Sequence, residues 1–537
     1  MTAVSSSADK PLDGHTARRT TGAAILVALG ILVSRVFGVF RQILTAHYLG
    51  TGGAADAFTA AFKIPQILRN LFGEGAMSAA FIPVYSRLLA RGEDEDANRL
   101  AGAVFALLAL LVSVLVLIGV IAAPVLIPII AAGFKDPTRR ELTIEFTRIC
   151  FPGAGIFVLS AWCLGVLNSH RKFLLSYLAP VLWNIAMIAA LLWGGHAGQS
   201  PHDLAATLAW ASVVGAALQF VVQIPATLAV SGRLRLSLGR KSQHVRTVVR
   251  NFGPAFVSRG VVQISGYIDQ WLASFLPIGI VATLSYAQSI YLLPVSLFGT
   301  AISAAELPEM SRALGDHEQV ATYLRERMTS ALRQIAFLVI PSGVAFLALG
   351  DEIAGLLFQH GRFDARDTMY AWGVLAGAAV GLLATTSGRL YSSTYYALHD
   401  TRTPLRYAIV RVILTTILGA LFALWLPGVL GIAPNWGAAG LTASAGIAGW
   451  VEFALLRRGL SGRIGVAHIP SRFTWSVWGA ALAAALASWG VRFLVHGRSR
   501  HLAELAVIVS FGLVYLVATM ALGIPEARGF LRRMRRR

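Results

Sequence analysis

A largely apolar stretch over residues 31–91 carries charged side chains at depths where a lipid-facing helix would have none: Arg35, Arg41, Asp56, Lys63, Arg69 and Glu74. An intramembrane charge costs roughly 2.5–3.5 kcal/mol on insertion scales, so these groups must face polar surroundings. Four of them are cationic and two are anionic, which leaves a surplus of positive charge. A cationic cavity inside a membrane calls for an anionic substrate, and arginine is the side chain best suited to phosphate oxygens.

The alternative is that these charges only pair with one another and hold helices together, as Arg69 and Glu74 would. Pairing explains the set less well, because the cations outnumber the carboxylates. Arg35 and Arg41 lie about 120° apart around a helix and about 9 Å apart along it, which suits a broad cavity better than a narrow seam. Gly38 and Pro65 predict bent helices, which membrane proteins place where backbone lines a cavity.

Composition defines the class of protein. The chain has 537 residues, of which 56% are hydrophobic and 13% are charged, so it is predicted to cross a membrane many times. The net charge of +20 sits mostly in short connections between apolar spans, which indicates topology and not nucleic-acid binding. Cys150 and Cys163 are about 20 Å apart along a helix and cannot bridge. No metal, cofactor or nucleotide motif is visible, so we do not expect an enzyme.

Hydropathy and turn signals predict an all-α polytopic membrane protein with fourteen transmembrane helices. The predicted spans are residues 22–48, 55–90, 101–130, 143–167, 173–194, 204–230, 247–275, 279–312, 328–350, 367–397, 404–426, 435–457, 473–496 and 502–523. Basic residues concentrate in even-numbered connections and at both termini, which predicts that both termini are cytoplasmic. We expect a disordered cytoplasmic segment at 1–20, a basic cytoplasmic linker at 231–246 and a basic cytoplasmic tail at 524–537.

Short motifs recur at nearly one offset and predict an internal repeat. SAA at 78–80 returns at 303–305, FG at 72–73 returns at 298–299, and VSR at 33–35 returns at 257–259. Since six spans separate equivalent points, the two copies should have the same orientation. This predicts an N-lobe at 21–230 and a C-lobe at 247–457, with the last two spans, 473–523, outside the repeat. Parallel repeats of this kind place the substrate between them, as in transporters.

Three longer motifs are SRVFGVFRQ at 34–42, DAFTAAFKIPQILRNLFGEGAMSAAFIPVYS at 56–86 and YYALHDTRTP at 395–404. With them, about residues 22–523 resemble the lipid II flippase (MurJ/MviN) family of the multidrug/oligosaccharidyl-lipid/polysaccharide exporter superfamily. The resemblance implies two six-helix lobes around a cationic cavity and two C-terminal helices that flank a groove for the polyprenyl tail. It also implies alternating-access export of lipid II, the peptidoglycan precursor, across the bacterial cytoplasmic (inner) membrane.

The resemblance carries roles to individual residues. It implies substrate contacts for the three arginines that match the family's essential ones, Arg35, Arg41 and Arg69, and for the other charged positions, Asp56, Lys63, Glu74 and Arg389. Two positions depart from the family pattern. The family often has an acidic residue at the position of Gln42, and its span 8 motif carries an arginine at the position of Ser289. The repeat puts Arg259 at the position equivalent to Arg35, so we hypothesise that Arg259 supplies the phosphate contact that relatives make from span 8.

Energy coupling and substrate identity remain open at this point. A diphosphate headgroup with about two negative charges gains roughly 4.6 kcal/mol per 100 mV on moving to the positive outer side, so the membrane potential could drive export. Cation coupling through Asp269 is the alternative, and Asp269 could instead be a partner for Arg259. The substrate could be another polyprenyl-diphosphate oligosaccharide, and a cation-coupled small-molecule antiporter is disfavoured by the arginines. The expected partners are this glycolipid, membrane lipids and cell-wall synthesis proteins, without nucleic acid.

Overall fold

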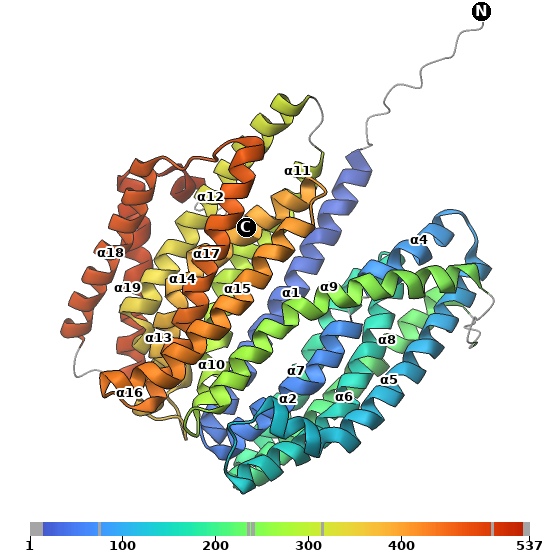
Figure 1. Cartoon of the computed structure of the whole chain (residues 1–537), viewed down its shortest axis with the longest axis horizontal. Helices are drawn as coiled ribbons and strands as arrows, with labels where there is room; N and C mark the ends of the chain where they lie inside the picture. Colours follow the sequence, from blue (N-terminus) through green and yellow to red (C-terminus); the bar gives the residue numbers. More distant parts are fainter. Residues whose placement is uncertain are drawn as a thin grey trace, which may run out of the picture.

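The computed structural model describes residues 14–73, 77–232, 237, 242–312, 316–495 and 499–529, and in these ranges every regular element is a helix. Side chains are described throughout these ranges except at residues 14–29, 31, 64 and 254–265. Figure 1 shows the helices in two groups that follow one another along the chain. This arrangement agrees with the all-α fold expected from the hydropathy pattern.

The N-terminal group holds the first six predicted spans. Its helices are α1 (Gly14–Leu49), α2 (Gly53–Phe72), the π-helix η1 (Met77–Phe81), α4 (Ile82–Ala90), α5 (Asp94–Ile130), α6 (Pro137–Ser169), α7 (Phe173–His196) and α8 (Pro201–Ser231). Helix α6 packs against α2, α5 and α8, and α1 packs along α7. Helix α1 begins inside the segment predicted to be disordered, and residues 1–13 lie outside the described ranges.

The C-terminal group holds the remaining eight spans. Its helices are α9 (Gln243–Ser274), α10 (Ile280–Pro294), the π-helix η2 (Val295–Thr300), α11 (Ala301–Ser311), α12 (His317–Ala348), α13 (Gly350–Phe358), α14 (Ala365–Ala397), α15 (Arg402–Ala420), the π-helix η3 (Leu421–Trp425), α16 (Leu426–Leu430), the 3-10 helix η4 (Pro434–Trp436), α17 (Gly437–Ile464), α18 (Ser471–Leu494) and α19 (Arg500–Ala521). Helix α14 is central, because it packs extensively on α17 and α12.

These elements account for the fourteen predicted segments, several of them built from more than one helix. In the described ranges, eleven helical segments are long and apolar enough to cross a membrane. The other three segments contain α1, α2 and α9, which carry most of the charged residues predicted to bind substrate. The polar segment at 317–327 continues without a break into the ninth span, so α12 is longer than that predicted span.

The repeat is visible as a local irregularity in the second span of each lobe. Helix α2 ends at Phe72 and helical structure resumes at η1, and in the C-terminal group η2 separates α10 from α11. Single-turn π-helices commonly mark functional positions in membrane helices. Helices α1 and α2 continue through Gly38 and Pro65, whose predicted bends stay predictions, and the interruption in the second span comes after Phe72.

The outer surface of α5 shows where lipid meets the protein. Leu117, Ile121, Val125 and Ile129 recur every four residues and are all more than half exposed, whereas Ile127 on the opposite face is fully buried. Both faces of α5 are apolar. One face packs against the protein interior, and the other is exposed to an apolar solvent, the lipid. The chain is therefore a multi-pass membrane protein.

Helix α9 links the two groups. The first residues of α9 pack in the hydrophobic cluster formed by η1, α4, α5 and α6, and α9 also packs on α10, α15 and α17 of the C-terminal group. Figure 1 shows α9 crossing from the N-terminal helices towards α10. The last two helices, α18 and α19, pack on each other and on α12 through a separate cluster that includes Phe473 and Phe511.

Candidate functional site

Asp56 joins the two lobes. It lies in the first turn of α2, is fully buried, and accepts hydrogen bonds from the backbone N–H groups of Gly279 (2.7 Å) and Ala282 (2.8 Å) at the start of α10. The first N–H groups of a helix have no intrahelical partner and attract negative charge, which fits a carboxylate at this place. Asp56 therefore caps a helix of the C-lobe from the N-lobe.

Arg139 completes this contact. Its side chain is only 4% exposed, pairs with the Asp56 carboxylate at 3.1 Å, and lies over the ring of Phe134 at 3.6 Å from the centroid. One guanidinium nitrogen also donates to the backbone oxygen of Ser274 (3.4 Å), which is the last residue of α9 in the C-lobe. The Asp56 carboxylate thus has three partners in this state, and its expected contact with substrate stays a prediction.

Further hydrogen bonds between the lobes surround this pair. Thr51 donates to Asp367 at 2.6 Å, and the hydroxyl of Tyr286 donates to the backbone oxygen of Gly50 at 2.9 Å. We call the five residues Thr51, Asp56, Arg139, Gly279 and Asp367 the interlobe latch. All of them lie in or beside the odd-numbered connections, at residues 50–52, 131–136, 275–279 and 359–364. The latch therefore closes one end of the space between the lobes.

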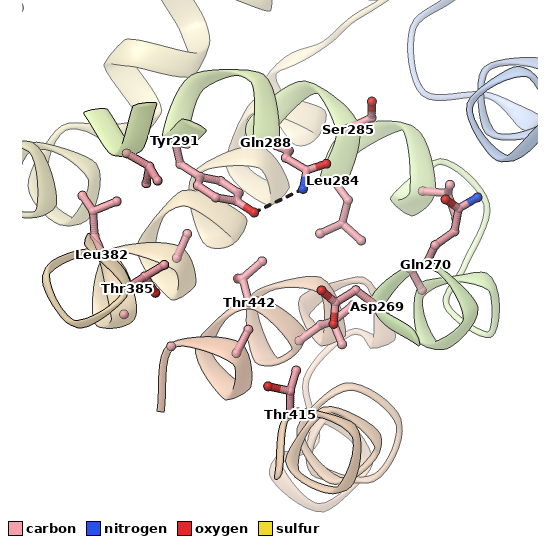
Figure 2. A pocket seen from close by; sticks show the side chains of 18 of the residues that line it. Asp269, Gln270, Leu284, Ser285, Gln288, Tyr291, Leu382, Thr385, Thr415 and Thr442 are labelled. Carbon is pink, nitrogen blue, oxygen red and sulfur yellow. Dashed lines mark hydrogen bonds between the residues drawn. The ribbon is translucent and has the colours of Figure 1, made fainter. Parts of the chain in front are cut away.

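A small central pocket lies between the latch and the opposite end of the bundle. Thr59 and Lys63 contribute to it from the N-lobe, and the other lining residues come from α9, α10, η2, α14, α15 and α17. Figure 2 shows Asp269, Gln270 and Thr415 on one side of the pocket and Gln288 donating to Tyr291 on the other. Its volume of about 170 Å³ is below the range of roughly 300–1,000 Å³ typical of ligand pockets. This pocket alone is therefore smaller than a typical ligand site.

The pocket contains charges that the sequence prediction had only partly identified. Lys63 and Asp269 were predicted from their types, but Arg411 and its partner Glu452 were not. Arg411 lines the pocket from α15 and donates to Glu452 of α17 at 3.0 Å. Both residues lie in spans whose composition is that of ordinary apolar helices. Two opposite charges inside neighbouring spans are the sequence feature from which this pair could have been predicted.

Two of the predicted arginines lie on one aromatic cluster inside the N-lobe. The guanidinium of Arg41 lies over Trp183 at 4.9 Å and donates from Nε to Asn184 at 3.1 Å. The guanidinium of Arg69 lies over Phe157 at 4.4 Å, and Phe157 meets Trp183 edge to face at 5.7 Å between centroids. The sequence analysis missed the aromatic side chains, because their spans are far from Arg41 and Arg69 along the chain.

Stacking on these rings has two consequences. It replaces part of the hydration that a charge loses inside a membrane. Trp183 and Phe157 also fix the direction of the two side chains, which lowers the entropy cost of binding a phosphate. The arrangement can therefore serve as a rigid cationic surface facing an anion.

The remaining predicted residues are more scattered. Arg35 lies on α1 with an exposed side chain, and Arg389 on α14 is exposed and donates to Thr300 of η2 at 3.2 Å. Ser289 donates to the backbone oxygen of Tyr286 and does not line the central pocket. Glu74 lies outside the described residues, and the side chain of Arg259 lies outside the described side chains, so their predicted contacts stay predictions.

The third motif, at 395–404, contains the start of α15. Asp400 accepts from the backbone N–H groups of Arg402 and Thr403, both at 3.0 Å, and pairs with Arg463 of α17 at 2.8 Å. The hydrogen bonds from Thr403, together with Arg463, lower the pKa of Asp400 to about 2. The motif therefore fixes the connection between α14 and α15 against α17.

Comparison with known proteins gives a consistent result. The family model described as "Lipid II flippase MurJ" matches residues 45–518. A probable lipid II flippase MurJ of Rhizobium tropici is 32% identical over 443 residues, which is 81% of this chain and 80% of the relative. The lipid II flippase MurJ of Burkholderia cenocepacia is also 32% identical, over 94% of this chain and 97% of its own length.

Solved structures agree on the fold. A lipid II flippase MurJ in an inward closed conformation superposes with a TM-score of 0.76, at 24% identity, and covers 93% of this chain and 98% of its own. An inward-facing multidrug transporter of the MATE family superposes with a TM-score of 0.63, at 17% identity, over 82% of this chain and 98% of its own. At these identities the structural similarity supports the fold only.

Proposed function

Because this chain belongs to the lipid II flippase MurJ family, we propose that it moves lipid II across the cytoplasmic membrane by alternating access of its two lobes. The observation that carries this proposal is the pair of arginines, Arg41 and Arg69, on the aromatic cluster of the N-lobe. Two fixed guanidinium groups suit a diphosphate, which offers several oxygens to each of them. Arg35, Arg389 and Lys63 would add further positive charge around the headgroup.

Alternating access needs a contact between the lobes that can form and break. The interlobe latch has this character, because it consists of hydrogen bonds and one ion pair and is built from short connections. The central pocket is smaller than a typical ligand site, so a sugar-diphosphate headgroup would occupy more of the space between the lobes than this pocket alone. Opening of the latch would release the headgroup on the side where the odd-numbered connections lie.

The function is tested by complementation. The full chain should restore growth and normal shape to a strain depleted of its own lipid II flippase. Accumulation of lipid II in the inner leaflet despite good expression would contradict the proposal. Export of a different polyprenyl-diphosphate oligosaccharide is the second candidate function, since Ser289 takes the place of an arginine in the family motif. Failure of this complementation together with transport of another glycolipid would support this second function.

The energy source stays a proposal. The membrane potential favours outward movement of a diphosphate headgroup by roughly 4.6 kcal/mol per 100 mV for about two charges. The potential therefore acts in the direction of export and supplies enough free energy to drive it. Coupling to a cation at Asp269 is the alternative. Lys63 and Arg411 both interact electrostatically with Asp269, so a soluble cation would have to compete with two cations of the protein itself.

Topology provides a separate prediction. Both termini and the connection at 231–250 should be cytoplasmic, whereas the connections at 131–142 and 351–366 should face outward, because basic residues favour the cytoplasmic side. Single cysteines at Gln243 and Lys135 can be treated with an impermeant thiol reagent in intact cells. Lys135→Cys should react and Gln243→Cys should not, and the natural Cys150 and Cys163 are buried and should stay silent. Labelling of Gln243→Cys from outside would contradict the fourteen-span topology.

A further inference from the structure

The central pocket brings a positive charge of one lobe against charges of the other. Lys63 projects from α2 of the N-lobe, and Asp269 and Arg411 project from α9 and α15 of the C-lobe. The hydroxyl of Tyr267, on α9, donates to the backbone oxygen of Lys63 at 3.3 Å, which fixes α2 beside α9. The pocket is therefore part of the surface along which the two lobes separate.

The charges around the pocket balance across this surface. Lys63 interacts electrostatically with Asp269, and Asp269 interacts with both Lys63 and Arg411. Arg411 already has a carboxylate partner, Glu452, at 3.0 Å. Two cations therefore face two carboxylates while the lobes are together. When the lobes separate, Lys63 leaves with the N-lobe and loses the negative charge of Asp269.

Several polar atoms in the same pocket are not satisfied. Asp269 Oδ1, both polar side-chain atoms of Gln270 and the hydroxyl of Thr415 are buried and make no hydrogen bond to the described part of the chain. A buried polar atom without a partner costs about 1–3 kcal/mol, so this set does not form a settled structural network. Asp269 and Lys63 line the same pocket and attract each other across it without an ion pair within 4.0 Å, so this attraction is easy to exchange.

We propose that Lys63 and Asp269 form an exchangeable charge interaction across the pocket between the lobes, in which a substrate diphosphate replaces Asp269 as the partner of Lys63. The inference rests on the proposed function. It assigns to Lys63 the role of coupling substrate binding to opening of the latch. Asp269, once released, keeps the attraction of Arg411, which it shares with Glu452. The substrate-free protein then keeps its latch closed, and the substrate favours opening because it binds more tightly where Lys63 is free.

The test measures the latch directly in the full chain, purified in lipid nanodiscs. Spin labels are attached to Gly52→Cys, where an added side chain meets nothing within 4 Å, and to the exposed Ala365→Cys on the other lobe. Pulsed dipolar spectroscopy gives the fraction of molecules with a widened latch. Asp269→Asn should raise this fraction about fivefold or more without ligand, the range typical of coupling between sites. Inorganic pyrophosphate should raise it in the labelled parent but not in Lys63→Gln.

A matched control is Asp351→Asn, which removes a carboxylate that pairs with Arg492 within the C-terminal group at 3.0 Å. It should leave the latch distances and the pyrophosphate response unchanged. A purely structural Asp269 would lower thermal stability but keep the response. The proposal is overturned if Asp269→Asn leaves the latch as closed as in the parent, or if Lys63→Gln still responds to pyrophosphate. Complementation reports separately on lipid II: its failure with an intact pyrophosphate response would reject the substrate and keep the charge interaction.

Discussion

Arg41→Ala is expected to abolish flipping while the protein stays folded in the membrane. The substitution removes the hydrogen bond to Asn184 and the stacking on Trp183, together with the charge that we propose to bind diphosphate. Loss of one partner from a buried charged contact costs about 2–5 kcal/mol, which is roughly thirtyfold or more in affinity. Growth of a flippase-depleted strain measures the effect, and the amount of full-length protein in the membrane fraction shows whether folding is retained.

Arg69→Ala should have a similar effect, because Arg69 lies on the same aromatic cluster through Phe157, and Arg35→Ala is expected to fail as well. Arg41→Lys should recover little, since a lysine cannot both stack on Trp183 and present two parallel donors. Arg99→Ala is the matched control, because Arg99 is exposed and pairs with Glu95 four residues earlier on α5. Full complementation by Arg41→Ala and Arg69→Ala would mean that the arginines are structural, and the substrate assignment would fail.

The fold was predictable from the sequence because lipid imposes a simple pattern. Apolar runs, basic connections and the recurrence of short motifs gave the helices, their number and the family, which the family model and the solved structures confirm. Gly38 and Pro65 predicted bent helices, but no pattern in the sequence predicted the irregular second span of each lobe. The actual breaks, at η1 and η2, depend on backbone geometry that residue types do not encode.

The site was less predictable because its contacts join distant parts of the chain. Residue types singled out Asp56 as a functional charge, but its partners Arg139 and Gly279 lie 83 and 223 positions away. Arg139 itself falls beside a polar connection, where a basic residue reads as solvent-exposed. Spacing within one helix could place Arg35 relative to Arg41, yet it could not show that Arg41 and Arg69 meet on rings from α6 and α7. Tertiary packing alone brings these residues together.

Asp56→Ala is expected to open the latch and to stop transport. The substitution leaves the buried Arg139 without its carboxylate and removes the acceptor of two N–H groups at the start of α10. Removing one partner of a buried ion pair costs about 3–5 kcal/mol, enough to shift an equilibrium between closed and open lobes by more than a hundredfold. The same pair of spin labels should report a wider distance without any ligand.

A second variant separates the latch from simple misfolding. Asp56→Asn keeps the size of the side chain and one acceptor oxygen but loses the charge, so it should be folded, partly open and impaired in complementation. Asp367→Asn should have a smaller effect, because its side chain is less buried and Thr51 can still donate to the amide oxygen. If Asp56→Asn retained both the parent distance and full complementation, the ion pair would not control the lobes. The order expected from burial is therefore Asp56→Ala, then Asp56→Asn, then Asp367→Asn, because the cost of an unpaired charge rises as water is excluded from it.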